Sequence, residues 1–263
     1  MGASSTMALR SPDTALVDAL RAAGCVFAED EARVLRDAAS DEGELERMLA
    51  ERVAGAPLEI VVGHADFCGL RMAVAPGVFV PRRRSEVLVR VAAVGLGPGD
   101  VAVDLCCGTG ALGAALLDAV GGLEVHAADV DPAAVACARR NLPPDQVHEG
   151  DLYAALPADL RGRVRVVVAN APYVPTDEIA LMPPEARDHE HRVALDGGAD
   201  GLDVQRGVIA GAPAWLAPGG RVLVETSRGQ AGRTVALMEA AGLTADVVRD
   251  DEVDGTVAIG RAP

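Results

Sequence analysis

The sequence predicts an α/β fold with a doubly wound, seven-stranded and mostly parallel sheet that ends in an antiparallel edge strand. Two observations support this prediction. From about residue 88 onward, short apolar runs alternate with segments of helical periodicity. Strands that read as nearly continuous apolar runs between helices are typical of a parallel sheet covered by helices on both faces. A small N-terminal helical domain, joined by a β-hairpin, is expected to precede the sheet.

The N-terminal part of the chain is expected to be helical. In residues 11–55, the segments TALVDALRAAG, EDEARVLRDAAS and DEGELERMLAERVAG repeat apolar residues at helical spacing. Residues 1–10 contain no basic stretch followed by an apolar one, so we interpret them as a flexible tail and not as a secretory signal. Residues 56–84 alternate apolar and polar positions and contain many turn formers, which predicts a hairpin linker.

The C-terminal domain, residues 85–263, is expected to alternate strands and helices. The sequence predicts strands at 101–106, 123–130, 145–150, 164–170, 220–226, 244–250 and 256–261. It predicts helices at 110–120, 132–141, about 200–216 and 229–241. In a doubly wound sheet, ligands bind outside the carboxyl ends of the central strands, so functional residues are expected there.

The composition excludes several classes of protein. The 263 residues include 39 Asp and Glu against 24 Lys and Arg, for a net charge of −15. Such an acidic chain is a poor partner for a phosphate backbone, so nucleic acid is not expected as the direct substrate. No apolar run reaches the ~18 residues that a membrane-spanning helix needs. Five cysteines without a C-x-x-C pair indicate a reducing, cytoplasmic location and no zinc site.

The first strand of the sheet leads into a glycine-rich turn, in the segment VAVDLCCGTGALGAAL. Gly108 and Gly110 allow the backbone to approach a ligand, and the helix that follows presents its N-terminal amides there. Cys106 occupies the place of the first glycine of G-x-G-x-x-G, so the spacing does not fit a nicotinamide-binding turn. Asp104, just before the turn, can meet the cationic amino-acid end of a ligand or can simply cap the turn.

Two further acids stand where the next two strands end. Asp129, in HAADVDP, is at the position from which a carboxylate accepts the two hydroxyls of a ribose. Asp131 is better explained as the N-cap of the next helix, because Pro132 follows it. Asp151, in EGDLY, can reach an adenine amino group or cap a helix. With Asp104, Asp129 and Asp151 at the tips of three successive strands, the set suits an adenosyl ligand with a positive sulfonium and no phosphate.

The motifs VDLCCGTGALG, ADVDP, GDLY and NAPY resemble those of class I S-adenosylmethionine-dependent methyltransferases, which have a Rossmann-like fold. More closely, the chain resembles the HemK/PrmC-type protein-(glutamine-N5) methyltransferases. PLEIVVGHADFCGLRMAVAPGVFVPR is similar to that family's hairpin and P-R segment. PEARDHEHRVALDGGADGLD is similar to its E-x-R-D-x-E-P-x-x-A-L-x-G-G-x-D-G-L segment. The resemblance covers about residues 55–262, and the helical N-terminus occupies the place of the family's substrate-recognition domain.

The resemblance implies methyl transfer from S-adenosylmethionine to the side-chain amide nitrogen of a glutamine. The partner it implies is a protein with an exposed glutamine, either a peptide-release factor or a ribosomal protein. The cofactor-binding residues it implies are Pro81, Arg82, Asp104, Cys106, Gly108, Thr109, Gly110, Asp129, Val130, Asp151, Leu152 and Asn170. Catalysis is assigned to Asn170, Ala171, Pro172 and Tyr173. Substrate binding is assigned to Asn170, Tyr173 and Glu190.

The strand exit VVVANAPYVPT fits this chemistry. An amide nitrogen is a poor nucleophile because its lone pair is delocalised into the carbonyl, so transfer needs a fixed geometry and acceptors for both N–H bonds. Asn170 Oδ1 and the Ala171 carbonyl are expected to be those acceptors. Pro172 holds the preceding residue extended, and Tyr173 can stack on the planar amide. The alternative is an ordinary strand-to-loop exit that stops at a proline.

Three departures from the family's motifs place the chain on a side branch with an unassigned protein substrate. Ala171 replaces the first proline of N-P-P-Y. Arg83, Arg84 and Ser85 stand where the family has P-E/D-T in P-R-P-E/D-T-E. The last departure is in the loop after the strand, where His189 and His191 replace an aromatic residue and a proline.

Two other functions remain open at this point. An N6-adenine methyltransferase would also grip an NH2 group at such a strand exit, but it needs a basic groove that this acidic chain lacks. A module that binds the cofactor without catalysis is supported only by Ala171 and Cys106. His189, Glu190 and His191 invite a metal interpretation, but the sequence places no further ligand beside them, so no metal is expected.

Overall fold

The computed structural model describes residues 12–263, and the tail predicted for residues 1–10 lies outside this range. The chain forms two compact units, one that ends at Gly63 and one that runs from His64 to Pro263. No helix in the described part of the chain, where the longest has 12 residues, could cross a membrane.

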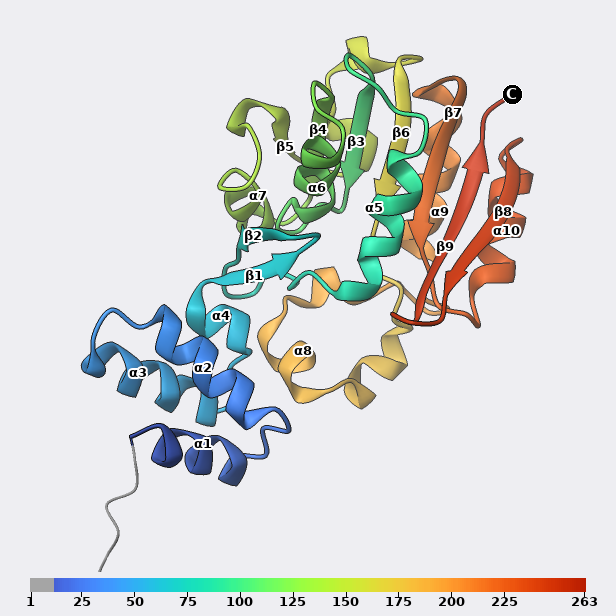
Figure 1. The fold of residues 1–263 in the computed structure, drawn as a ribbon. Coiled ribbons are helices and arrows are strands. Elements are labelled where there is room, and N and C mark those ends of the chain that lie inside the picture. Colours follow the sequence, from blue (N-terminus) through green and yellow to red (C-terminus); the bar gives the residue numbers. More distant parts are fainter. Residues whose placement is uncertain (1–11) are drawn as a thin grey trace, which may run out of the picture. The chain divides into compact units, whose positions relative to one another are not determined.

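The first unit is a small helical bundle (Figure 1). Its helices are α1 (Pro12–Ala22), α2 (Ala28–Ala38), α3 (Glu42–Val53) and α4 (Leu58–Val62). The core is formed by Leu16, Leu20, Leu35, Leu45, Met48 and Val61, all buried. Asp41 caps α3 by accepting a hydrogen bond from the Glu44 amide at 2.8 Å, which satisfies one of the amides that a helix start leaves unpaired.

The predicted hairpin linker begins later than expected. Residues 58–62 form α4 and not a strand, because Val61 fills the core of the helical unit. Gly63, at φ 77°, ends that helix in the left-handed conformation. The hairpin consists of β1 (His64–Phe67) and β2 (Leu70–Ala73), and it belongs to the second unit, where Phe67 packs into the core beside the sheet.

The second unit contains the predicted seven-stranded sheet, in the order β5-β4-β3-β6-β7-β9-β8. The strands are β3 (Val101–Leu105), β4 (Glu124–Asp129), β5 (Val147–Glu149), β6 (Val164–Ala169), β7 (Leu216–Glu225), β8 (Thr244–Asp250) and β9 (Gly255–Arg261). The first five are parallel, whereas β9 runs antiparallel to both β7 and β8. The closing strand pair therefore forms the predicted antiparallel edge, with β8 outermost.

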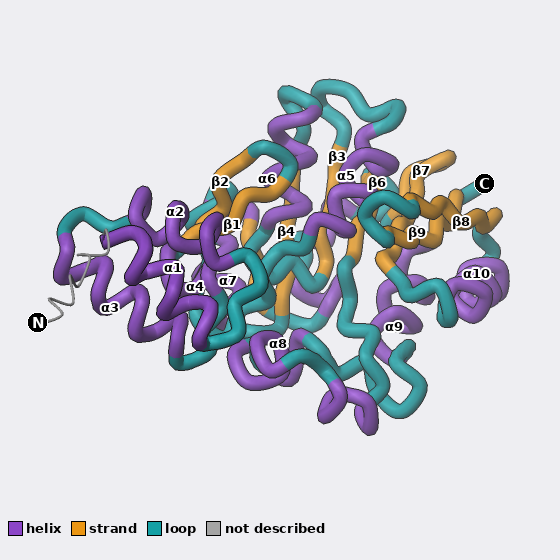
Figure 2. Tube along the Cα trace, turned by 60° about the horizontal axis from the view of Figure 1, so that its bottom comes forward, coloured by secondary structure: helices purple, strands orange, loops and turns teal. Residues whose placement is uncertain are grey.

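Helices cover both faces of this sheet, as the apolar strands predicted (Figures 1 and 2). In β6, Val166 and Val168 pack with α5 and α6, whereas Val167 and Ala169 pack with α9 and α10 on the opposite face. The helices of this unit are α5 (Glu86–Ala93), α6 (Ala111–Ala119), α7 (Pro132–Ala138), α8 (Pro184–His189), α9 (Asp203–Gly211) and α10 (Ala231–Ala240).

The sequence analysis missed two of these helices. The segment EVLVRVAA of α5 is apolar at almost every position, because the helix is buried against the sheet and α6, and so it shows no clear period. Helix α8 has only six residues, too few for a periodic signal. Helix α9 ends earlier than predicted because residues 212–214, with Pro213 among them, tighten into a 3₁₀ turn.

The topology places a crevice at the carboxyl ends of β3, β4 and β6. Strand β3 lies between β4 and β6. The connection after β3 leads to β4 on one side of it, and the connection after β5 leads to β6 on its other side. Such a reversal of strand order opens a ligand-binding crevice. The long connection from β6 to β7, which includes α8, lies at this end of the strands (Figure 1).

Candidate active site

The glycine-rich turn after β3 is held in a conformation that L-residues rarely adopt. Cys106, Gly108 and Gly110 all have positive φ, at 56°, 54° and 75°. The turn is closed by a hydrogen bond from the Gly110 amide to the Cys107 carbonyl at 2.7 Å. Cys106 is not a glycine, so its left-handed backbone conformation is strained. The turn delivers the chain into α6 at Ala111.

Asp129 connects the tip of β4 to this turn. Its Oδ2 accepts a hydrogen bond from the Gly108 amide, and its Oδ1 accepts one from the Asp131 amide, both at 2.9 Å. Burial raises the pKa of Asp129, although the two backbone amides oppose that shift. The neighbouring Asp131 is the N-cap of α7, as predicted: it accepts from the Ala133 amide at 2.9 Å.

Asp104 is not on the wall of the crevice, which differs from the expectation that it meets the ligand. It is buried in β3, where its Oδ2 accepts a hydrogen bond from the Gly113 amide at 2.9 Å and so holds the first turn of α6. Its Oδ1 is buried and bonds to no described residue. Burial raises the pKa of Asp104 to about 8, and the charge of Asp129 acts in the same direction.

A pocket opens between the turn, the strand tips and the hairpin region. It is lined by nine of the twelve predicted cofactor-binding residues, namely Pro81, Cys106, Gly108, Thr109, Asp129, Val130, Asp151, Leu152 and Asn170. Asp104, Gly110 and Arg82 are not part of the lining. Asp151 makes no side-chain capping bond to the short helix that follows it, so the capping alternative is not realised.

The sequence analysis missed several lining residues, among them Phe67, Phe79, Ser85, Val193 and Ala194. A signal for two of them was available. Only three phenylalanines occur in 263 residues, so Phe67 and Phe79 are rare aromatic residues that could have been considered as ligand contacts. Ser85 and the residues of the 190s carry no such signal, because only the folded chain brings them to the pocket.

Glu190 and Arg82 bind each other. The Glu190 side chain is 2% exposed, and its Oε1 lies 2.6 Å from Arg82 Nη2. The same oxygen accepts a long hydrogen bond of 3.3 Å from the Val80 amide. The structure therefore gives Glu190 a different place from the predicted substrate-binding one: it anchors the segment after α8 to the strand-like segment around Val80, and Val193 and Ala194 follow from that segment onto the pocket wall.

His191 contributes to the same anchoring. Its Nδ1 lies 2.6 Å from Asp131 Oδ2, and its backbone amide donates to the Gly77 carbonyl at 2.7 Å. Gly77 leaves room for the ring, since a Cβ there would fall 2.3 Å from His191 Nε2. Among residues 12–263, no group of three or more His, Cys, Asp or Glu side chains is arranged to hold a metal ion.

The exit of β6 brings Asn170 to the pocket. Its Nδ2 donates a long hydrogen bond of 3.5 Å to Ser85 Oγ. Within residues 12–263, neither Asn170 Oδ1 nor the Ala171 carbonyl accepts a hydrogen bond. Pro172 lines the pocket beside Asn170. The turn therefore offers two oxygen acceptors that the folded chain does not use.

Tyr173 lies next to the pocket but not in its lining. Its hydroxyl is 3.5 Å from Glu225 Oε1, at the end of β7. Burial raises the pKa of Tyr173 to about 12, and the Glu225 carboxylate adds to that shift. The hydroxyl therefore stays protonated and donates to Glu225.

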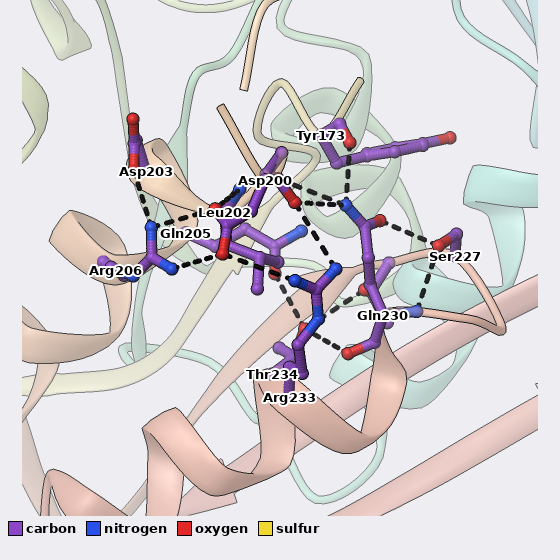
Figure 3. Close-up of polar contacts among 12 residues, drawn as sticks. Tyr173, Asp200, Leu202, Asp203, Gln205, Arg206, Ser227, Gln230, Arg233 and Thr234 are labelled. Atoms are coloured by element: carbon purple, nitrogen blue, oxygen red, sulfur yellow. Dashed lines mark hydrogen bonds and ion pairs between the residues drawn. The ribbon is translucent and has the colours of Figure 1, made fainter. Parts of the chain in front are cut away.

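The backbone of Tyr173 is held by a buried glutamine (Figure 3). Gln230 Nε2 donates to the Tyr173 carbonyl at 2.9 Å and lies 3.4 Å from the carbonyls of Asp200 and Gly201. Ser227 Oγ donates to Gln230 Oε1 at 2.8 Å and so fixes the orientation of the amide. Gly201 is required for this approach, because a Cβ there would fall 2.4 Å from the Tyr173 carbonyl oxygen.

Known proteins share this sequence over most of its length. The release factor glutamine methyltransferase of Streptomyces coelicolor is 42% identical over 192 residues, which cover 71% of this chain and 68% of that protein. The protein of the same name from Cereibacter sphaeroides is 36% identical over 254 residues, which cover 92% of this chain and 89% of that one. The chain belongs to the release factor glutamine methyltransferase family. The resemblance predicted from the motifs is thereby confirmed, and the protein is an S-adenosylmethionine-dependent methyltransferase.

Two further comparisons agree with this family. Residues 70–182 match the family described as the methyltransferase small domain. The crystal structure of a methyltransferase from Pyrococcus furiosus has a TM-score of 0.55 at 18% identity and covers 73% of this chain and 89% of that one. This second likeness concerns the fold, and it confirms the predicted Rossmann-like class.

The pocket itself suits a cofactor with a positive sulfonium and no phosphate. The described residues that line it include no arginine. It contains the Asp129 carboxyl, and the Asp104 carboxyl lies buried behind the turn. The pKa values of both are raised mainly because burial leaves their charges uncompensated. A cation nearby favours the charged form of such groups.

Proposed function

We propose that this protein methylates the side-chain amide nitrogen of a glutamine in a peptide-release factor. The observation that carries the proposal is the pair of oxygens at the exit of β6. Asn170 Oδ1 belongs to a residue that lines the pocket, the carbonyl of the buried Ala171 follows it in the chain, and neither oxygen accepts a hydrogen bond from residues 12–263. Two acceptors on one side match the two N–H bonds of a carboxamide. The names of the relatives in Streptomyces coelicolor and Cereibacter sphaeroides support a release factor as the acceptor protein.

The two oxygens act by orienting the target amide and accepting hydrogen bonds from its two N–H groups, one of whose protons is released to water once the nitrogen carries the methyl group. S-adenosylmethionine supplies an electrophilic methyl group on a positive sulfur. Hydrogen bonds to Asn170 Oδ1 and the Ala171 carbonyl hold the nitrogen in one orientation and stabilise the positive charge that develops on it. In this proposal the long hydrogen bond from Asn170 Nδ2 to Ser85 Oγ engages the NH2 group and leaves Oδ1 to accept from the target amide.

Alanine at position 171 preserves this function in our proposal. The acceptor at that position is the backbone carbonyl, which any residue provides, and Pro172 restricts residue 171 to extended conformations. Ala171 is fully buried, so its position is also set by packing. The loss of the family's proline removes local rigidity and leaves the hydrogen-bond acceptor in place.

We assign cofactor binding to the pocket residues. We assign the ribose hydroxyls to Asp129, the adenine to Asp151 and the amino-acid end to the turn from Cys106 to Gly108, all of which line the pocket. Asp104 and Gly110 support the turn from behind. We assign recognition of the acceptor protein to the helical unit, which the match to the Cereibacter sphaeroides relative, over 92% of the chain, includes in large part. Five free cysteines support a reducing, cytoplasmic setting.

The test is methylation of a defined protein. The full chain is incubated with methyl-labelled S-adenosylmethionine and a purified peptide-release factor, and the digested acceptor is analysed by mass spectrometry. We expect a single peptide with one monomethylated glutamine, and no label once that glutamine is replaced by asparagine. A ribosomal protein and an RNA oligonucleotide serve as competing acceptors. Label in the RNA, with none in the protein, would reject the proposal in favour of an adenine methyltransferase.

A further inference from the structure

Arg84 lies close to the strand exit that carries the two acceptor oxygens. It belongs to the short 3₁₀ turn Arg83–Ser85, directly before the serine that bonds to Asn170. Its guanidinium carbon is 5.9 Å from the centre of the Tyr173 ring. Arg84 therefore lies near Tyr173 and, through its neighbour Ser85, near Asn170. The family that the sequence resembles has an acid at this position, so the arginine distinguishes this chain.

One edge of the Arg84 guanidinium is held in place. Its Nε lies 3.1 Å from Glu225 Oε1, the oxygen that also accepts from the Tyr173 hydroxyl. The Glu225 side chain is 2% exposed, whereas the Arg84 side chain is 42% exposed. The two terminal NH2 groups of Arg84 form no hydrogen bond with residues 12–263. The buried carboxylate thus holds Nε, which we call the inner edge of the guanidinium fork. The two terminal NH2 groups, its outer edge, remain accessible.

The chemistry of the outer edge identifies its ligand. The Glu225 carboxylate lies close enough to Nε to offset most of the positive charge of the guanidinium. What remains is a rigid fork with N–H donors, which suits oxygen acceptors. A polypeptide offers neutral oxygen acceptors at every residue of its backbone. Neutral carbonyl oxygens fit a guanidinium that is already paired better than a further carboxylate does.

We propose that Arg84 binds the acceptor polypeptide through backbone carbonyl oxygens that flank the target glutamine. This inference rests on the proposed function, since it takes the acceptor to be a protein. Arg84 acts in acceptor binding, and the chemical step is left to Asn170 and Ala171. Glu225 is a positioning residue, because it orients both the arginine fork and the Tyr173 hydroxyl.

The experiment compares substitutions at two neighbouring arginines in the full chain. Arg84→Gln and Arg83→Gln change the net charge equally, but Arg83 is exposed and makes no described side-chain contact. Initial rates of methylation of a purified release factor are measured at saturating cofactor. For Arg84→Gln, KM for the release factor should rise by about five- to thirty-fold, the loss of one or two hydrogen bonds. For Arg83→Gln, KM should change less than two-fold (about the measurement error).

Arg84→Lys tests whether the acceptor is bound by the hydrogen-bond donors of the guanidinium or by its positive charge. A lysine keeps a cation for Glu225 and so protects the fold, but it has no second edge to offer. KM should therefore stay raised in Arg84→Lys, while the affinity for S-adenosylmethionine, measured by calorimetry, and the thermal unfolding midpoint stay near those of the unaltered chain. The rise in KM should also be the same at low and high salt, because the ligand is neutral.

Each contrary result has a distinct meaning. Recovery of KM by Arg84→Lys, or a strong salt dependence, would overturn the carbonyl assignment and indicate an acidic acceptor. An unchanged KM in Arg84→Gln, with the unaltered chain active on the release factor, would overturn the role of Arg84 alone. No methylation of the release factor by the unaltered chain would reject the proposed function, and the role of Arg84 with it.

Discussion

The cofactor side and the acceptor side that we propose for this site are built by different kinds of contact. On the cofactor side, side chains bind backbone amides that are near in sequence: Asp104 reaches Gly113, 9 residues away, and Asp129 reaches Gly108, 21 residues away. On the acceptor side, contacts join distant segments. Asn170 and Ser85 are 85 residues apart, and Glu225 and Arg84 are 141 residues apart.

The difference teaches that the two sides can be perturbed separately. The cofactor side is one strand-turn-helix unit with its neighbouring strand tip, so a fault there should affect cofactor affinity or the stability of the fold. The acceptor side depends on the convergence of four segments around Tyr173 and Asn170. A fault there should affect the rate of transfer and the binding of the acceptor, with the cofactor still bound.

The largest effect is expected from Asn170→Ala. It removes one of the two oxygen acceptors for the target amide, so kcat should fall about 10²- to 10³-fold, as for the loss of one preorganised group at a reacting centre. The affinity for S-adenosylmethionine, measured by calorimetry, should change by less than about three-fold (one weak hydrogen bond at most). Full activity in this variant would refute the role of Asn170.

Gly110→Ala should be the most damaging change to the cofactor side. At φ 75°, a Cβ would lie 2.9 Å from Leu142 Cδ1 and 3.2 Å from Ala138 Cβ. The strained backbone and the overpacking together should lower the free energy of unfolding by about 2–4 kcal/mol, measured by urea denaturation. Gly95→Ala is the matched control, with φ 78° and no atom within 4 Å of the added Cβ. It should cost about 1 kcal/mol, because only the backbone strain remains. Equal losses in both variants would show that packing against α7 is unimportant.

Asp129→Asn should weaken cofactor binding and leave methyl transfer nearly unchanged, the reverse of the result expected for Asn170→Ala. An asparagine can keep only one of the two backbone hydrogen bonds from Gly108 and Asp131, and its NH2 group then faces an amide donor. The dissociation constant for S-adenosylmethionine should rise about 10- to 100-fold. At saturating cofactor, kcat should stay within about three-fold of that of the unaltered protein. A large fall in kcat with unchanged cofactor affinity would contradict the division into two sides.

Gln230→Met should have a smaller effect on the acceptor side. Methionine fills a similar volume but cannot donate to the Tyr173 carbonyl, so the turn from Asn170 to Tyr173 loses its downstream anchor. We expect kcat to fall about three- to ten-fold, as for one net hydrogen bond, with cofactor affinity unchanged. Ser227→Ala removes the hydroxyl that donates to Gln230 Oε1 and accepts from the Gln230 amide, but it leaves the bond to the Tyr173 carbonyl and should reduce kcat less. A loss of cofactor affinity in Gln230→Met would show that the anchor serves the whole site.

The smallest effect on catalysis is expected from Asp104→Asn, which retains an oxygen for the Gly113 amide behind the pocket wall. Its effect should appear in the pH dependence of stability. The folded pKa of Asp104, about 8, is above its unfolded value of 3.8, so between these values the unfolded chain releases a proton that the folded chain keeps. The contribution of Asp104 to stability therefore falls as pH rises from about 4 to 8. The free energy of unfolding of Asp104→Asn should fall less steeply over this range, and parallel curves would contradict the raised pKa.

Much of the cofactor side could be predicted from the sequence. The strand, the turn with Gly108 and Gly110, and the acid Asp129 follow one another closely, and nine of the twelve predicted cofactor-binding residues line the pocket. The place of Asp104 could not be predicted, because an acid at this position in the sequence can either face a ligand or bond to a helix amide. The contact between Glu190 and Arg82 could not be predicted, because Arg82 lies 108 residues earlier in the chain.

The sequence by itself determined the seven strands of the sheet, their mostly parallel arrangement and the family, because these depend on local periodicity and on short motifs. It also determined the chemical groups at the exit of β6, since Asn170, Ala171 and Pro172 are consecutive residues. Only the tertiary structure decided which residues hold that exit. Ser85, Arg84, Glu225 and Gln230 come from three separate parts of the chain, and a linear pattern cannot show which of them will meet, because their contacts depend on how the sheet, α5 and α10 pack together.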